Sequence, residues 1–155
     1  MAHTIVIGIG NPSRRDDGAG IAAVRRLRQL RMDGVVFVEC TGDLTTLPNI
    51  WQGYNRVILI DAMHWGQKPG EVLRFDASRY LPPSDVRFAS THAFGLVETL
   101  ALAQALNQLP PSLLLYGIEG KDFADGEGLS PEVEMAVADV VHYIQQDLAD
   151  DISDA

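Results

Sequence analysis

The sequence predicts a three-layer α/β/α fold, in which helices cover both faces of a mostly parallel sheet of five strands, one of them antiparallel. Two observations lead to this prediction. Short apolar runs rich in β-branched residues alternate along the chain with longer segments whose apolar residues recur at helical spacing. The runs are apolar almost without interruption, as in strands that are buried on both faces of a parallel sheet.

Five segments are expected to be strands. Four apolar runs give the parallel strands. The remaining segment follows the turn signal Pro69-Gly70 and is expected to return antiparallel beside the third strand, at or near an edge. In chain order the five segments are 4–9, 35–38, 56–61, 71–75 and 112–118. If the sheet is doubly wound in the order 2-1-3, the first and third strands are neighbours.

Four segments are expected to be helical. Because aspartate is a good N-cap, the first helix should begin near Asp16 or Asp17. Ser130 as N-cap and Pro131 at the first helical position predict the start of the last helix. Its acidic tail, from about Asp147, is expected to fray and to be solvated. The other two helices are expected within 44–51 and from about His92 to Pro110.

The composition favours one folded domain, residues 1–155, and argues against nucleic acid and membranes as partners. Of the 155 residues, 46% are hydrophobic, so a packed core is expected. The net charge of −9 argues against nucleic acid and anionic membranes, because both attract basic proteins. The single cysteine, Cys40, and the lack of a signal-peptide pattern or a membrane-spanning apolar run favour a cytoplasmic location. The sequence is compatible with a monomer and does not fix the oligomeric state.

Three residues that are far apart in the sequence form the candidate site. Asp17 follows the first strand and Asp61 ends the third, so the order 2-1-3 brings both acids to the crevice at the carboxyl ends of these strands. His92 lies at the expected start of the third helix. Two carboxylates and an imidazole make a compact ligand set for a borderline divalent metal. The sequence therefore predicts a metal site at this edge of the sheet.

Each of the three residues also has a plainer explanation. Asp16 or Asp17 could serve only as a helix cap, and the choice between the two as a site residue stays open. An acid at the end of a strand, such as Asp61, commonly hydrogen-bonds loop amides. A lone histidine such as His92 is more often an exposed or satisfied side chain than a ligand. His64, three residues beyond Asp61, is a further histidine that could reach the same crevice.

Other patterns support weaker interpretations. Gly8-x-Gly10 after a strand suggests a dinucleotide site, with Glu39 as a ribose-binding acid, but Ser13 stands where the fingerprint needs a third glycine. Two acids at the helix start would also repel a pyrophosphate. No motif supports Cys40 as a nucleophile. The pair Arg14-Arg15 is interpreted as solvated charge rather than as a contact to a substrate carboxylate.

Four motifs in collinear order resemble the maturation endopeptidases of nickel–iron hydrogenases, from about Ile5 to Tyr143. The motifs are Gly8-Ile9-Gly10-Asn11 with Asp16-Asp17; Ile60-Asp61-Ala62 with Pro69-Gly70; His92-Ala93-Phe94-Gly95-Leu96; and Leu129-Ser130-Pro131-Glu132-Val133. One departure is Cys40, which replaces a small, glycine-like residue after the second strand. This difference bears on the shape of the loop that faces the substrate.

The resemblance implies a phosphorylase/hydrolase-like fold and a peptidase that acts on the precursor of a hydrogenase large subunit. A single cleavage after nickel insertion would release a short C-terminal extension. Carried over by position, Asp17, Asp61 and His92 would be both the catalytic and the nickel-contacting residues. The nickel would arrive with the precursor instead of being held permanently, and no cofactor-binding residues are implied.

Two competing classes remain open from the sequence. One is a non-catalytic α/β domain that binds a metal or a nucleotide. The other is a metal-independent peptidase of the same fold, such as the germination proteases of spores.

Overall fold

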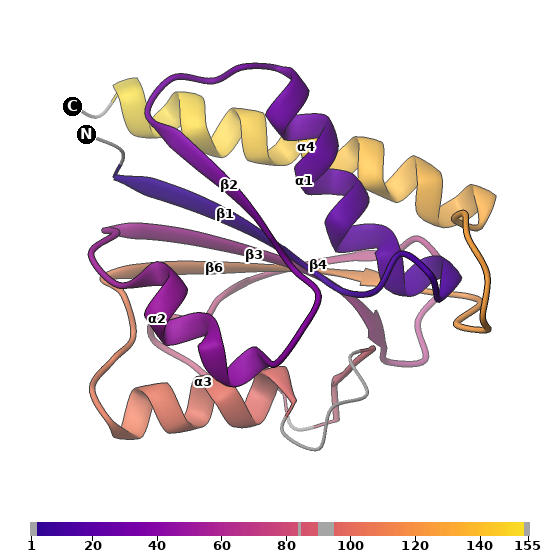
Figure 1. The fold of residues 1–155 in the computed structure, drawn as a ribbon, viewed down its shortest axis with the longest axis horizontal. Coiled ribbons are helices and arrows are strands. Elements are labelled where there is room, and N and C mark those ends of the chain that lie inside the picture. The colour runs from indigo at the N-terminus through magenta and orange to yellow at the C-terminus, as the bar shows by residue number, and fades with distance from the viewer. Residues whose placement is uncertain (1–2, 84, 90–94, 154–155) are drawn as a thin grey trace.

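The computed structural model describes residues 3–83, 85–89 and 95–153, and it confirms the three-layer α/β/α architecture. Helices α1 (Ala19–Gln29) and α4 (Pro131–Ser153) cover one face of the sheet, and α2 (Leu47–Trp51) and α3 (Leu96–Ala105) cover the other (Figure 1). Two short 3₁₀ turns, η1 (Arg15–Gly18) and η2 (Leu44–Thr46), precede α1 and α2.

The sheet is doubly wound, and the predicted order 2-1-3 runs from one edge, β2, to its central strand, β3. Its strands are β1 (Thr4–Ile9), β2 (Val35–Cys40), β3 (Arg56–His64), β4 (Val72–Asp76), β5 (Arg87–Phe88) and β6 (Ser112–Glu119). The main path runs β2-β1-β3-β6-β4, and β5 pairs with β3. Strands β2, β1, β3 and β6 are parallel, whereas β4 and β5 run antiparallel to their partners.

Three strand predictions need correction. Strand β4 pairs with β6 and not with β3, because β6 already occupies that edge of β3 over the register from Arg56 to Met63. Strand β3 does not end at Asp61 but continues to His64, where β6 and β5 flank it. The sixth strand, β5, lies inside the expected loop 78–89. It is only two residues long, which is too short for an alternating pattern of apolar residues to indicate a strand.

The helix starts also differ from the predictions. No aspartate side chain caps the first helix: a 3₁₀ turn comes first, and Gly18 is the N-cap of α1. Helix α3 begins at Leu96, with Gly95 as its N-cap, and the expected start near His92 lies in the stretch 90–94, outside the described residues. The expected fraying from Asp147 is wrong, because α4 continues to Ser153. The Asp147 carboxylate accepts hydrogen bonds from the Tyr116 hydroxyl and from Arg74, which fix this part of α4 to the sheet.

Side chains of the central strands alternate between two buried clusters, one on each face of the sheet. On β3, Ile58 and Ile60 face the α1/α4 side, and Val57 and Leu59 face the α2/α3 side. By the same alternation Asp61 points to the α2/α3 side. No helix within the described ranges is long and apolar enough to span a membrane.

Glycines let α1 lie directly on the sheet. A Cβ on Gly20 would lie 2.3 Å from the carbonyl oxygen of Ile60 and 2.5 Å from that of Ile9. A Cβ on Gly8 would lie 2.3 Å from the carbonyl oxygen of Gly20. The start of α1 is therefore seated between β1 and β3, beside the point where these strands diverge.

Candidate active site

The loop between β1 and α1 places Asp17 at the carboxyl edge of the sheet. Gly10 has φ +145°, and its Cβ position would lie 1.9 Å from the carbonyl oxygen of Asp17, so only glycine permits this fold of the loop. The Asn11 amide donates to that carbonyl at 3.1 Å. The Asp17 residue is 2% exposed, and its Oδ2 forms an ion pair of 3.8 Å with Nη1 of Arg14.

Asp61 lies at the point in β3 where the neighbouring strand on one side changes from β1 to β5. The last pair between β1 and β3 is Gly8 with Ile60, and pairing with β5 begins at Met63, so Asp61 sits between the two. On the other side it pairs with Gly117 of β6. Asp61 is fully buried, and neither of its carboxylate oxygens has a hydrogen-bond partner in the described part of the chain.

Burial raises the pKa of Asp61 well above that of an ordinary aspartate, and the negative charge of Asp17 raises it further. The Ala62 amide lowers the pKa of Asp61, although it is not in hydrogen-bond geometry with either carboxylate oxygen. The two acids are therefore close enough to interact electrostatically. A buried carboxyl in this setting is costly as a free anion and would be stabilised by a cation between the two side chains.

Asp16 has entirely different surroundings. Its carboxylate is fully buried and accepts four hydrogen bonds from the segment between β6 and α4. The donors are the amides of Lys121 (2.8 Å), Asp122 (2.9 Å) and Ser130 (2.7 Å) and the Ser130 hydroxyl (2.8 Å). Burial raises the pKa of Asp16, and these hydrogen bonds outweigh that effect and lower it overall. Both of its oxygens are thus committed to holding the loop.

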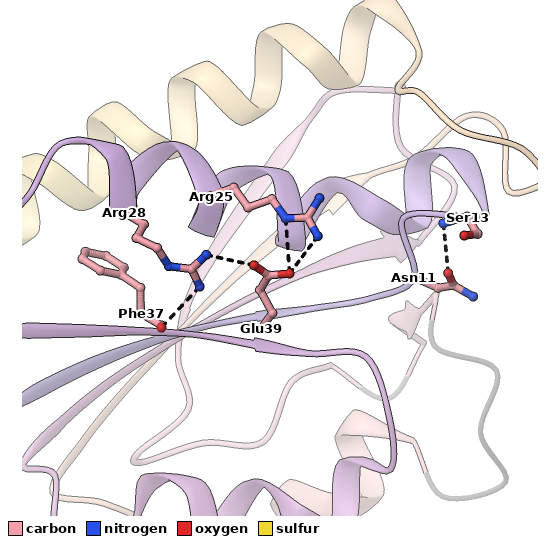
Figure 2. A network of polar contacts seen from close by, with 6 residues as sticks. All are labelled: Asn11, Ser13, Arg25, Arg28, Phe37 and Glu39. Carbon is pink, nitrogen blue, oxygen red and sulfur yellow. Dashed lines mark hydrogen bonds and ion pairs between the residues drawn. The ribbon is translucent and has the colours of Figure 1, made fainter.

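The surroundings of the other two candidates, the Glu39 carboxylate and the Cys40 thiol, indicate structural roles. Glu39 of β2 accepts hydrogen bonds from Arg25 and Arg28 of α1, which lie 2.9 Å from its two oxygens (Figure 2). This ion-pair cluster occupies the carboxylate that a dinucleotide site would need for a ribose. Cys40 is buried, and loss of solvent raises the pKa of its thiol, which disfavours the nucleophilic thiolate. It lies within electrostatic range of Asp61.

Of the two histidine candidates, only His64 lies within the residues that the structure describes. His64 is exposed at the end of β3, and its ring packs edge-on against Phe123 with centroids 5.7 Å apart. His92 lies in the stretch 90–94, outside the described residues. Across the described ranges no three groups among histidine, cysteine, aspartate and glutamate come together to hold a metal ion. The structure therefore brings Asp17 and Asp61 together and leaves the third predicted member untested.

Sequence reasoning missed Glu119, a further buried acid at the same edge of the sheet. Its residue is 2% exposed, and its carboxylate accepts hydrogen bonds from the amides of Trp65 and Gln67. Glu119 ends the apolar run of β6 much as Asp61 comes late in that of β3. That similarity was the available signal, but the acidic segment after Glu119 obscured it.

A cavity of about 580 Å³ lies at the opposite edge of the sheet, before β3 and β6 begin. It is lined by Pro48, Asn49, Trp51, Gln52, Gly53, Tyr54, Asn55, Asn107, Gln108, Leu109, Pro110 and Pro111. None of these side chains is charged, and none belongs to the candidate site. The chemistry-bearing residues thus gather at the carboxyl edge, as expected for a doubly wound sheet.

The fold and the site define a doubly wound α/β protein with a coupled pair of buried acids where its strand order reverses. The chain belongs to the hydrogenase maturation protease family, whose model matches residues 23–147. It is therefore a peptidase of hydrogenase maturation. Proteases of this kind act in general on precursors of hydrogenase large subunits.

Relatives in sequence and in structure agree with this assignment. The hydrogenase expression/formation protein HupD of Bradyrhizobium diazoefficiens is 29% identical in an alignment 157 positions long, which covers 94% of this chain and 78% of that protein. The [NiFe] hydrogenase maturation protease HybD of Thermococcus kodakarensis superposes with a TM-score of 0.75 at 30% identity, over 94% of this chain and 98% of the other. HybD of Escherichia coli, at 22% identity, has the same fold with a TM-score of 0.75, over 97% and 94% of the two chains.

Proposed function

We propose that this peptidase removes a short C-terminal extension from a hydrogenase large-subunit precursor that already carries nickel, and that Asp17, Asp61 and His92 contact that nickel. The observation that carries the proposal is the Asp61 carboxylate. It is fully buried, its oxygens have no hydrogen-bond partner in the described ranges, and Asp17 is close enough to raise its pKa. Such a group is stable as an anion only beside a cation.

The chemistry of the two acids fits a cation that is delivered by the substrate. Carboxylate oxygens with an imidazole suit borderline divalent metals, and nickel is one of these. The described ranges hold no third ligand beside the two acids, so a permanent and tight metal site is not expected from them alone. A nickel ion that keeps its ligands in the precursor would need only a few additional contacts from the protease.

The protein residues would divide the work of hydrolysis. Nickel in the substrate would supply Lewis-acid polarisation of the scissile carbonyl. Asp61, the more deeply buried acid, would hold the precursor's metal centre against the carboxyl edge of the sheet. Asp17 would act as the general base that takes a proton from the attacking water as its oxygen bonds to the carbonyl carbon, and it would return that proton to the amine nitrogen as the C–N bond breaks. Arg14, in its ion pair with Asp17, would balance the negative charge when no substrate is present.

Two alternatives are less well supported. For a dinucleotide-binding domain, the acid that would hold a ribose, Glu39, is bound by Arg25 and Arg28. Asp16 and Asp17 are also buried where the pyrophosphate would approach. A metal-independent peptidase would leave the Asp61 oxygens, which have no hydrogen-bond partner in the described ranges, without a cation to contact. Cleavage that survives replacement of both Asp17 and Asp61 would favour that class.

The direct experiment compares two forms of one precursor. A hydrogenase large-subunit precursor from the same genome would be prepared with and without nickel and incubated with the protease, and the released extension would be followed by mass spectrometry. Cleavage of the nickel-loaded form only is expected. Equal cleavage of both forms would rule out nickel recognition, and cleavage of neither would rule out this precursor as the substrate.

A further inference from the structure

The segment after β6 is bound at several points to the η1 turn and to the residues just before it. The Asp16 amide donates to the Asp122 carbonyl at 3.0 Å, and the Arg15 amide donates to the Gly126 carbonyl at 2.8 Å. The Gly126 amide in turn donates to the Ser13 carbonyl at 2.9 Å. An ion pair of 3.6 Å joins Arg15 to Asp122. The loop 120–130 is thus attached to the η1 turn, which carries Asp17, through both backbone and side-chain contacts.

The Asp16 carboxylate is the centre of this attachment. Its Oδ1 accepts the Ser130 amide, and its Oδ2 accepts the amides of Lys121 and Asp122 and the Ser130 hydroxyl. All four partners are donors, so the position requires a group with two acceptor oxygens. An asparagine would turn its own N–H₂ group toward at least one of these donors. The site therefore needs a carboxylate, and a polar side chain of the same shape does not suffice.

The pairing of β3 with β6 connects this attachment to the candidate site. Loop 120–130 leaves the sheet at the end of β6, and Gly117 of β6 pairs with Asp61 of β3. The η1 turn enters from β1, on the other side of β3. Asp16 joins these two segments across β3, and the next residue in the chain is Asp17. The position of Asp17 relative to Asp61 therefore depends on the hydrogen bonds of Asp16.

We propose that Asp16 is a positioning residue for the protease reaction: it holds the η1 turn against the loop after β6 and so sets the placement of Asp17 opposite Asp61. This inference rests on the proposed function of Asp17 and Asp61. Asp16 itself contacts neither substrate nor metal. Its side chain acts only through the backbone that it shares with Asp17.

Glu119 provides a matched control for a purely structural role. It is also a buried carboxylate at the carboxyl edge, and it also holds a loop, through the amides of Trp65 and Gln67. No acid of the candidate site adjoins it in sequence. Asp16→Asn and Glu119→Gln are both expected to lower the melting temperature, since each disturbs a buried, hydrogen-bonded carboxylate.

The experiment measures kcat and KM for cleavage of the nickel-loaded precursor, well below the melting temperature of each variant. Asp16→Asn is expected to lower kcat by about 100-fold with little change in KM, because a displacement of about 1 Å in a reacting group has effects of that size. Glu119→Gln is expected to keep kcat within about three-fold of the wild type. Equal kcat values for the two variants would overturn the proposal.

Two further variants keep the test decisive. Ser130→Ala removes one of the four hydrogen bonds and leaves the rest, so it should lower kcat several-fold even if Asp16→Asn does not fold; an unchanged kcat would overturn the proposal. Asp61→Asn tests the proposed function separately. Full cleavage by Asp61→Asn would show that the acid pair is not the reactive site, whereas an inactive Asp61→Asn with a fully active Asp16→Asn would reject only the positioning role.

Discussion

Asp16 and Asp17 are neighbours in the chain, but their carboxylates face different parts of the molecule. Asp16 is bonded to Lys121, Asp122 and Ser130 in the loop after β6. Asp17 is ion-paired with Arg14 and electrostatically coupled to Asp61 of β3. The 3₁₀ turn produces this division, because adjacent side chains in such a turn point in directions about 120° apart. One acid therefore holds the loop, and the other interacts with Asp61.

Replacing Asp61 with asparagine should abolish cleavage and at the same time stabilise the metal-free protein. Its pKa is raised in the folded state, so the wild type loses stability as the pH rises from about 4, the pKa of an unfolded aspartate, through the folded value. Asparagine carries no charge and avoids this loss. At pH 7 a gain of about 1–3 kcal/mol in the free energy of unfolding is expected. The gain should disappear below pH 4.

Asp147→Asn is the control for this measurement. Asp147 accepts hydrogen bonds from Tyr116 and Arg74, so its neutral variant should be less stable than the wild type at pH 7. Urea denaturation at several pH values measures both variants. A destabilised Asp61→Asn at neutral pH would mean that the Asp61 carboxylate has a favourable partner in the free protein.

Gly20→Ala tests the close contact between α1 and the sheet. Alanine is the better helix former by about 1 kcal/mol, so the substitution would stabilise the protein if there were space. The new Cβ would instead meet the carbonyl oxygens of Ile60 and Ile9. A net loss of about 1–3 kcal/mol is expected. Gly42→Ala, whose Cβ meets no atom within 4 Å, should change the melting temperature little. Similar effects of the two substitutions would contradict the observed packing.

The ion-pair cluster on Glu39 should stabilise the protein in a pH-dependent way. Hydrogen bonds from Arg25 and then Arg28 lower the pKa of Glu39. The resulting stability is present above the pKa of an unfolded glutamate and is lost as the pH falls through the folded value. Glu39→Gln should therefore be less stable than the wild type at pH 7 and nearly equal to it at pH 3. Glu127→Gln makes the same charge change in an exposed loop and is the control; an equal loss of stability at pH 7 in both variants would contradict this account.

The C-terminal part of α4 should be needed for stability. Leu148 is 7% exposed in the core on the α1/α4 side, and Asp147 is bonded to Tyr116 and Arg74. A chain that ends after residue 146 loses both and should be destabilised by at least about 2 kcal/mol. A chain that ends after residue 153 should unfold like the full chain. Thermal unfolding of the two truncated chains, followed by circular dichroism, distinguishes this account from a frayed tail.

Parts of the fold that depend on long apolar runs could be predicted from the sequence. The runs at 4–9, 35–38 and 56–61 identify β1, β2 and the start of β3, and their order places Asp17 and Asp61 at one edge. The two-residue strand β5 and the pairing of β4 with β6 could not be predicted, because neither depends on local periodicity. The acidic tail misled the prediction for α4, since the partners of Asp147 lie 31 and 73 residues away in the chain.

The candidate site was predictable only in outline. Strand order brings the two acids together, but it does not distinguish Asp16 from Asp17. The difference lies in four donors, which come from residues 105 to 114 positions further along the chain. The burial of Glu119 could likewise not be predicted from the sequence, because the amides that bind its carboxylate belong to the turn after β3. Hydrogen bonds over such distances in the sequence leave no local pattern.

The shared cation position of Asp17 and Asp61 is tested most directly by anomalous diffraction from crystals of the protease soaked in nickel. A single anomalous peak is predicted within about 2.0–2.2 Å of a carboxylate oxygen from each of the two residues. A map in which the two carboxylates point away from each other, with no peak between them, would contradict the proposed site.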